Sequence, residues 1–75
     1  MKTIVRINVD GQLKEFYCDF LRVDKETKCL ELYFNNKDLF VELVEFSTTH
    51  KLNLEVKPIG MILIAPYDAL ESIMH

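Results

Sequence analysis

The chain has 75 residues, which is enough for one domain and too few for two. Hydrophobic residues make up 49% of the sequence, so a packed core is feasible and intrinsic disorder is excluded as the expected state. The formal net charge of −3 argues against binding to the phosphate backbone of nucleic acids, which needs a basic surface.

The Asp-Gly pair at positions 10–11 predicts a tight β-hairpin between strands over residues 2–9 and 13–23. A type I′ turn needs positive φ at both central residues, and Asp-Gly is a favoured pair for it. With a two-residue turn, Arg6 lies opposite Glu15 and Lys2 lies opposite Asp19. Opposite charges across the strands favour this register, which turns Tyr17 to the face opposite the predicted core.

A third strand is expected over residues 28–34, after a polar cluster at 24–27. Its apolar side chains at Leu30, Leu32 and Phe34 alternate with more polar ones, as in a strand with one buried face. A three-residue loop would set Phe20 opposite Leu32. The predicted core face would then extend over three strands.

The segment 39–46 can form either a strand or a helix. We favour a strand because Val and Phe dominate the segment, and because a helix would leave Val41 and Phe46 on its polar side. The helical alternative would cover residues 38–47 and would be capped by Asn36.

The last third of the chain predicts a half-buried strand over residues 52–57, ended by Pro58, and a buried strand over residues 61–65. Residues 66–75 predict a short helix with Asp68 as its N-cap, because Asp68 and Glu71 have the spacing of a capping box. The expected fold is mainly β: a small antiparallel sheet that curls into a partly open barrel of SH3-like, Sm-like or OB-like size, with a short C-terminal helix. The alternative is an α+β fold in which residues 38–47 are helical.

Apolar and aromatic side chains also occur on the face opposite the predicted core, and something must cover them. In one interpretation barrel curvature and the C-terminal helix cover this face, and in the other it is an exposed aromatic patch that marks an interaction surface. Tyrosine is enriched in interfaces, and a Glu31 placed directly opposite Glu42 would favour a basic partner. The residues expected to bind the partner are Tyr17, Tyr33, Phe40, Asp19, Glu31 and Glu42.

The sequence favours a protein that is not an enzyme and holds no cofactor or metal. His50 lies in a polar segment and His75 at the end of the chain, and neither has the spacing from a cysteine that zinc sites show. Cys18 is expected in the core, where its pKa would be raised and its nucleophilicity low. Cys18 and Cys29 are expected to be free thiols, which fits the cytoplasm. No signal sequence or membrane-length apolar run is visible.

We therefore expect a small protein-binding module of the cytoplasm, such as an accessory subunit, an adaptor or a small inhibitor. Its partner would be another protein or a second copy of the chain, which would make a homodimer. The alternative function is binding of single-stranded nucleic acid, because aromatic side chains on a sheet can stack on bases. The acidic residues of the same face argue against it.

Overall fold

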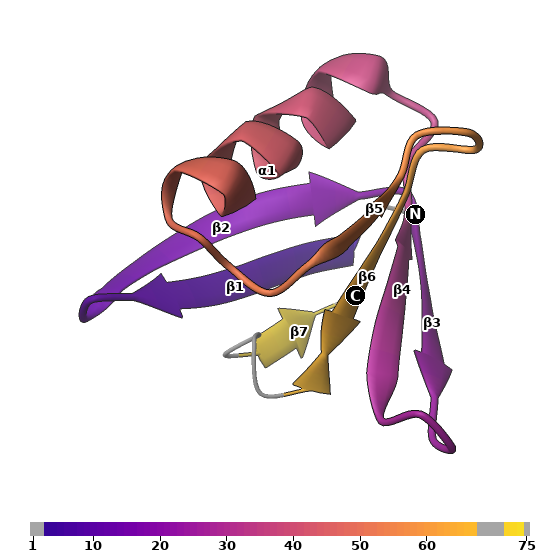
Figure 1. The fold of residues 1–75 in the computed structure, drawn as a ribbon, viewed down its shortest axis with the longest axis horizontal. Coiled ribbons are helices and arrows are strands. Elements are labelled where there is room, and N and C mark those ends of the chain that lie inside the picture. Colours follow the sequence, from indigo (N-terminus) through magenta and orange to yellow (C-terminus); the bar gives the residue numbers. More distant parts are fainter. Residues whose placement is uncertain (1–2, 68–71, 75) are drawn as a thin grey trace.

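Two antiparallel sheets and one helix make up residues 3–67 and 72–74, the part of the chain that the computed structural model describes (Figure 1). The elements are β1 (Thr3–Val9), β2 (Gln12–Cys18), β3 (Phe20–Asp24), β4 (Cys29–Tyr33), α1 (Lys37–Thr49), β5 (Glu55–Lys57), β6 (Ile62–Pro66) and β7 (Ser72–Met74). One sheet has the strand order β2-β1-β7 and the other has the order β3-β4-β6-β5. The predicted mainly β, antiparallel fold is confirmed, and the two sheets are not closed into a barrel.

The β1–β2 hairpin has the predicted turn and register. Asp10 and Gly11 have φ angles of 53° and 79°, both in the left-handed region that a type I′ turn requires. Thr3 pairs with Cys18 at one end of the ladder and Val9 with Gln12 at the other. The predicted charge pair forms, with Arg6 Nε 2.8 Å from Glu15 Oε2. Lys2, the other predicted cation of this hairpin, lies outside the described residues.

The predicted long second strand is interrupted at Asp19, which lies between β2 and β3. The Asp19 N–H donates to the carbonyl oxygen of Tyr33 at 2.9 Å, and its carboxylate accepts the Asn35 N–H at 2.7 Å. The bend reverses the alternation of the strand, so Phe16 points into the core but Phe20 points away from it. The prediction that Phe20 shares the core face was therefore wrong.

The register of β3 and β4 differs by one residue from the predicted one. Phe20 pairs with Tyr33, and Asp24 pairs with Cys29, so the loop has four residues and not three. The Asp24 carboxylate accepts the N–H groups of Glu26 and Thr27, and Lys28 adopts a left-handed φ of 56°. These local interactions close the longer loop.

Residues 37–49 form helix α1, so the preferred strand over residues 39–46 was wrong and the helical alternative is correct. Asn36 caps the N-terminus: its side-chain oxygen accepts the N–H groups of Asp38 at 2.8 Å and Leu39 at 3.3 Å. The C-terminus ends in a Schellman motif, in which the N–H of Leu52 donates to the Ser47 carbonyl and Lys51 has a φ of 54°.

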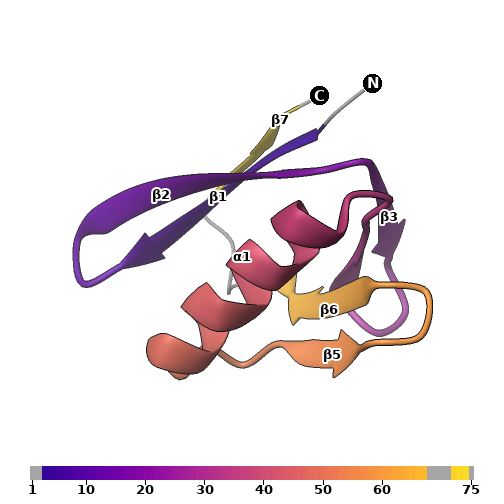
Figure 2. The same ribbon diagram turned by 90° about the horizontal axis from the view of Figure 1, so that it is seen from above.

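Helix α1 buries a wider arc of its surface than the sequence pattern predicts. Phe40, Leu43 and Ser47 are buried at the 3–4-residue spacing of one helix face. Val41 and Phe46, expected on a polar side, are half-buried against the core, and the Phe46 ring lies 4.9 Å from the ring of Phe16. Figure 2 shows α1 between the β1–β2 hairpin and the β5–β6 pair, and the core cluster joins Phe40 and Leu43 of α1 to residues of both sheets.

The C-terminal part contains both predicted strands, although the one predicted over residues 52–57 is reduced to its last three residues, which are exposed, and one prediction failed. β5 ends at Lys57, just before Pro58, and β6 covers the predicted apolar run shifted by one residue. The short helix predicted within residues 66–75 is wrong at Ser72–Met74, where the backbone forms β7 and pairs with β1. Residues 68–71 lie outside the described residues.

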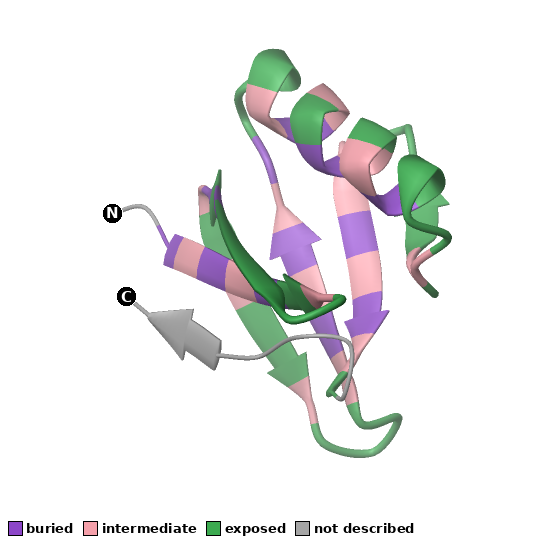
Figure 3. Cartoon of the chain, turned by 90° about the vertical axis from the view of Figure 1, so that its left-hand side faces the viewer, coloured by how far each residue is buried: buried purple, intermediate pink, exposed green. Residues whose placement is uncertain are grey.

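The core lies between the two sheets and α1. The buried bands in Figure 3 alternate with half-buried ones along the strands, as expected for strands with one inward face. The core cluster consists of Val5, Ile7, Phe16, Cys18, Leu32, Phe34, Phe40, Leu43 and Leu63. No helix in the described part of the chain has the length and hydropathy needed to cross a bilayer.

Candidate functional site

The four-stranded sheet has an inner face on the core and a second face directed away from it. Paired residues on neighbouring strands point to the same side, so the register divides the sheet into rows. The row that contains Leu32 and Leu63 lines the core, and the rows on either side of it point outward. Two outward rows cross all four strands: Phe20, Tyr33, Ile62 and Lys57 in one, and Arg22, Glu31, Ile64 and Glu55 in the other. We call these eight residues the outer face.

An aromatic pair lies at one corner of the outer face. Phe20 is 60% exposed, and its ring centroid lies 5.7 Å from that of Tyr33 at a tilt of 58°. Such tilted contacts stabilise both rings, yet more than half of Phe20 remains in water. The row continues with the half-buried Ile62 on β6. The sheet therefore presents a continuous apolar strip to solvent.

The second outward row carries a small polar network. Glu31 Oε1 accepts hydrogen bonds from Arg22 Nη1 at 3.3 Å and from the Tyr33 hydroxyl at 3.1 Å. The Arg22 side chain is 62% exposed and that of Glu31 is 21% exposed. The network fixes the Glu31 carboxylate and holds the Tyr33 ring against the sheet. It leaves most of the Arg22 guanidinium free to bind another acceptor, because that group has five N–H donors.

The predicted partner-binding residues are only partly brought together. Tyr33 and Glu31 are in contact on β4, and Asp19 lies beside them through its bond to the Tyr33 carbonyl. Tyr17 is 44% exposed but belongs to β2 in the other sheet.

The two predicted residues of the segment 39–46 are elsewhere. Phe40 is buried in the core, where its ring packs 5.6 Å from that of Phe34, so its assignment to a binding face was wrong. Glu42 is exposed on α1. The expected pairing of Glu31 with Glu42 does not exist, because Glu31 pairs with Arg22 and Ile64 instead.

Six of the eight residues of the outer face were missed as binding candidates: Phe20, Arg22, Glu55, Lys57, Ile62 and Ile64. Phe20 was placed in the core because the bend at Asp19 leaves no simple sequence signal. Ile62 and Ile64 belong to a continuous apolar run, which is typical of a strand whose two faces are both buried. One signal was present, since a register that pairs Arg22 with Glu31 would have placed Phe20 beside Tyr33.

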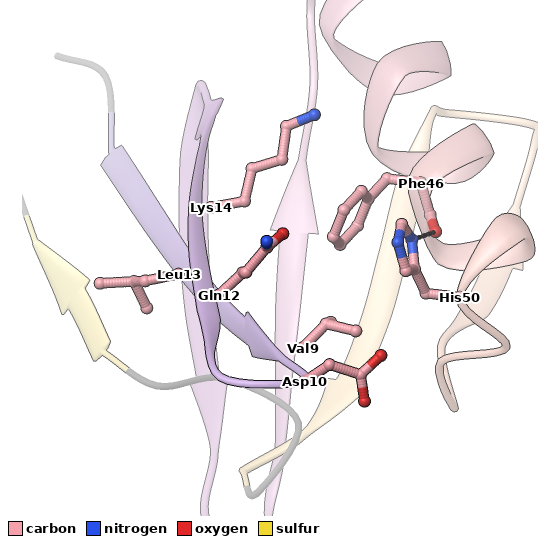
Figure 4. A pocket seen from close by; sticks show the side chains of 7 residues that line it. All are labelled: Val9, Asp10, Gln12, Leu13, Lys14, Phe46 and His50. Carbon is pink, nitrogen blue, oxygen red and sulfur yellow. Dashed lines mark hydrogen bonds between the residues drawn. The ribbon is translucent and has the colours of Figure 1, made fainter.

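A groove of about 340 Å³ lies between the tip of the β1–β2 hairpin and the C-terminal end of α1 (Figure 4). In Figure 4 the Phe46 ring lies between the Lys14 side chain and the His50 ring. Lys14 Nζ is 5.2 Å from the Phe46 ring centroid, and the His50 ring centroid is 4.2 Å from it. The His50 Nδ1 is 3.0 Å from the Phe46 carbonyl oxygen. The contact of Lys14 with the Phe46 ring joins the hairpin to the helix. The aromatic surface of the groove is therefore already occupied by contacts within the chain.

The described residues include two cysteines, the strongest nucleophiles among the common protein side chains. Burial, with a smaller contribution from the negative charge of Asp19, raises the pKa of the Cys18 thiol to about 11, as expected for an unreactive core cysteine. Cys29 is half-buried, and both thiols are free. Among residues 3–67 and 72–74, no three His, Cys, Asp or Glu side chains gather closely enough to hold a metal ion.

Comparison with known proteins adds no relative to this description. No protein-family model matches the chain, and neither a curated protein nor a solved structure matches it. The outer face therefore has to be interpreted from its own chemistry.

Proposed function

We propose that the protein is a non-catalytic protein-binding module that acts through the outer face, in the cytoplasm. The observation that supports this most is Phe20, an aromatic residue at the start of the edge strand β3 that stays 60% exposed and packs on Tyr33 at the surface. Exposed apolar strips rimmed by charges are typical of protein interaction sites, and aromatic residues and arginine are enriched among their energetic anchors.

Other features agree with this function. The outer face combines an aromatic pair and two isoleucines with four charged residues, three of them on the edge strands β3 and β5, and this mixture of apolar and charged side chains is found in protein interfaces. The two free cysteines fit a reducing compartment. The thiol of Cys18, with its raised pKa, is a poor nucleophile, which supports a binding role over catalysis.

Photo-cross-linking in cells that express the protein tests this function. A photoreactive phenylalanine analogue in place of Phe20 should give a discrete protein adduct. The matched control carries the analogue in place of Leu13, which is 52% exposed on the other sheet, and should give none. Adding Ile64→Lys to the Phe20 variant should abolish the adduct. Equal adducts at both positions, or none at Phe20, would contradict the proposal.

The folded state should tolerate the loss of this surface. Phe20→Ser should change the free energy of unfolding by less than about 1 kcal/mol, because most of the ring is already in water. A larger loss would identify Phe20 as part of the core.

A further inference from the structure

We propose that the partner of the outer face is a second copy of this chain, related by a two-fold axis that runs along the strands between β4 and β6. This inference rests on the proposed function, because it names the partner of the same surface. An isologous dimer requires a patch that is complementary to itself. The two outward rows of the four-stranded sheet have this property.

The strand order determines which residues would meet. With a two-fold axis parallel to the strands and between β4 and β6, β3 of one copy lies over β5 of the other. Each row of one copy then lies over the same row of the other copy. Arg22 then faces Glu55 of the second copy, and Phe20 faces Lys57. Each contact occurs twice because of the symmetry. In the centre, Tyr33 of each copy meets Ile62 of the other.

These contacts match in charge. Arg22 and Glu55 would form an ion pair, and Lys57 would lie over the Phe20 ring as a cation–π contact. Within the described part of the chain, neither Glu55 nor Lys57 forms an ion pair, and both are exposed. Arg22 is engaged through one nitrogen with Glu31, at 3.3 Å, so its remaining donors can reach a second carboxylate. The second copy would thus engage both of these charges on β5.

The area of the face sets the strength of the contact. Three strands of five residues and the three-residue β5, with strands about 4.8 Å apart and a rise of about 3.3 Å per residue, cover roughly 290 Å² of sheet. A standard stable interface buries about 800 Å² per partner, so this dimer belongs to the weak class. We expect reversible association with a dissociation constant between micromolar and millimolar.

Charge exchange between two variants tests the dimer and its axis. Sedimentation velocity of the wild-type chain over a range of concentrations should show a monomer–dimer equilibrium. Arg22→Glu alone would place two carboxylates face to face in each contact, and Glu55→Arg alone would place two guanidinium groups face to face. Each variant should associate at least roughly tenfold more weakly than the wild type. An equimolar mixture of the two should recover association, because every contact in the mixed dimer again joins Arg to Glu.

The control mixture is Lys57→Glu with Glu55→Lys, which should not recover association, because the lysine introduced at position 55 would still face Arg22. Recovery in this control mixture alone would overturn the axis along the strands, since it would mean that Lys57 faces Glu55. Circular dichroism should show that all four variants are folded.

A wild-type chain that stays monomeric up to millimolar concentration would overturn the dimer. The proposed function would then depend on the Phe20 cross-link: an adduct with a different protein would support an external partner. The absence of any adduct would contradict the function as well.

Discussion

Replacing Asn36 by alanine removes the side-chain oxygen that accepts the N–H groups of Asp38 at 2.8 Å and Leu39 at 3.3 Å. These N–H groups belong to the first turn of α1 and have no partner within the helix. Loss of such a cap costs about 1 kcal/mol, within a range of about 0.5–2 kcal/mol. For a domain of this size, the melting temperature should fall by about 4–8 °C per kcal/mol.

Urea denaturation followed by circular dichroism measures this loss as a lower midpoint at unchanged slope. Asn36→Asp should retain most of the stability, because aspartate caps a helix as well as asparagine does. The matched control is Asn35→Ala, which removes a neighbouring side chain but keeps the backbone N–H that donates to Asp19. Equal losses for Asn35→Ala and Asn36→Ala, or no loss for Asn36→Ala, would refute the capping role.

Leu43→Ala in the core should lower the free energy of unfolding by about 2–5 kcal/mol, while the exposed Leu13→Ala should lower it by less than about 0.5 kcal/mol. Equal losses in urea denaturation would contradict the assigned core. The Cys18 thiol has its pKa raised by burial from 9.0 to about 11, so the unfolded chain loses this proton first as the pH rises. Stability should therefore fall between these values by about 1.4 kcal/mol per pH unit relative to Cys18→Ala. Parallel pH profiles for wild type and variant would count against this. In the native protein a thiol reagent should modify Cys29 well before Cys18, and equal rates would show that Cys18 is accessible.

The first hairpin could be predicted because its determinants are local. Asp10 and Gly11 adopt the positive φ angles that their residue types favour, and the turn length then fixes every pair up to Thr3 and Cys18. The Arg6–Glu15 pair gave a second and independent indication of the same register. Where turn chemistry and charge pairing agree, the sequence determines the geometry.

The bend at Asp19 could not be predicted, because its cause is tertiary. The bond that holds the Asp19 carboxylate comes from the N–H of Asn35, sixteen residues away. Once the bend reverses the alternation, Phe20 changes from a core residue to the most exposed aromatic side chain of the described chain. Two of the eight outer-face residues, Phe20 and Arg22, owe their outward direction to this change of phase.

The segment of helix α1 was predicted as a strand because a helix was assumed to pack against one flat surface, with a single apolar face. In such a helix the apolar side chains of Val41 and Phe46 would lie on the polar side, exposed to water. In the fold, α1 packs against both sheets, so these side chains are half-buried as well. The packing of the helix therefore outweighs the modest preference of Val and Phe for strands. The N-cap at Asn36 was the correct local signal.

Backbone amide NMR shifts, followed over a wide range of protein concentration, should identify the outer face of the four-stranded sheet as the binding surface. Concentration-dependent shifts should occur on β3, β4, β5 and β6, at the two outward rows around Phe20 and Arg22. Shifts that gather at the groove between the hairpin tip and α1, or on the other sheet around Tyr17, would contradict this assignment.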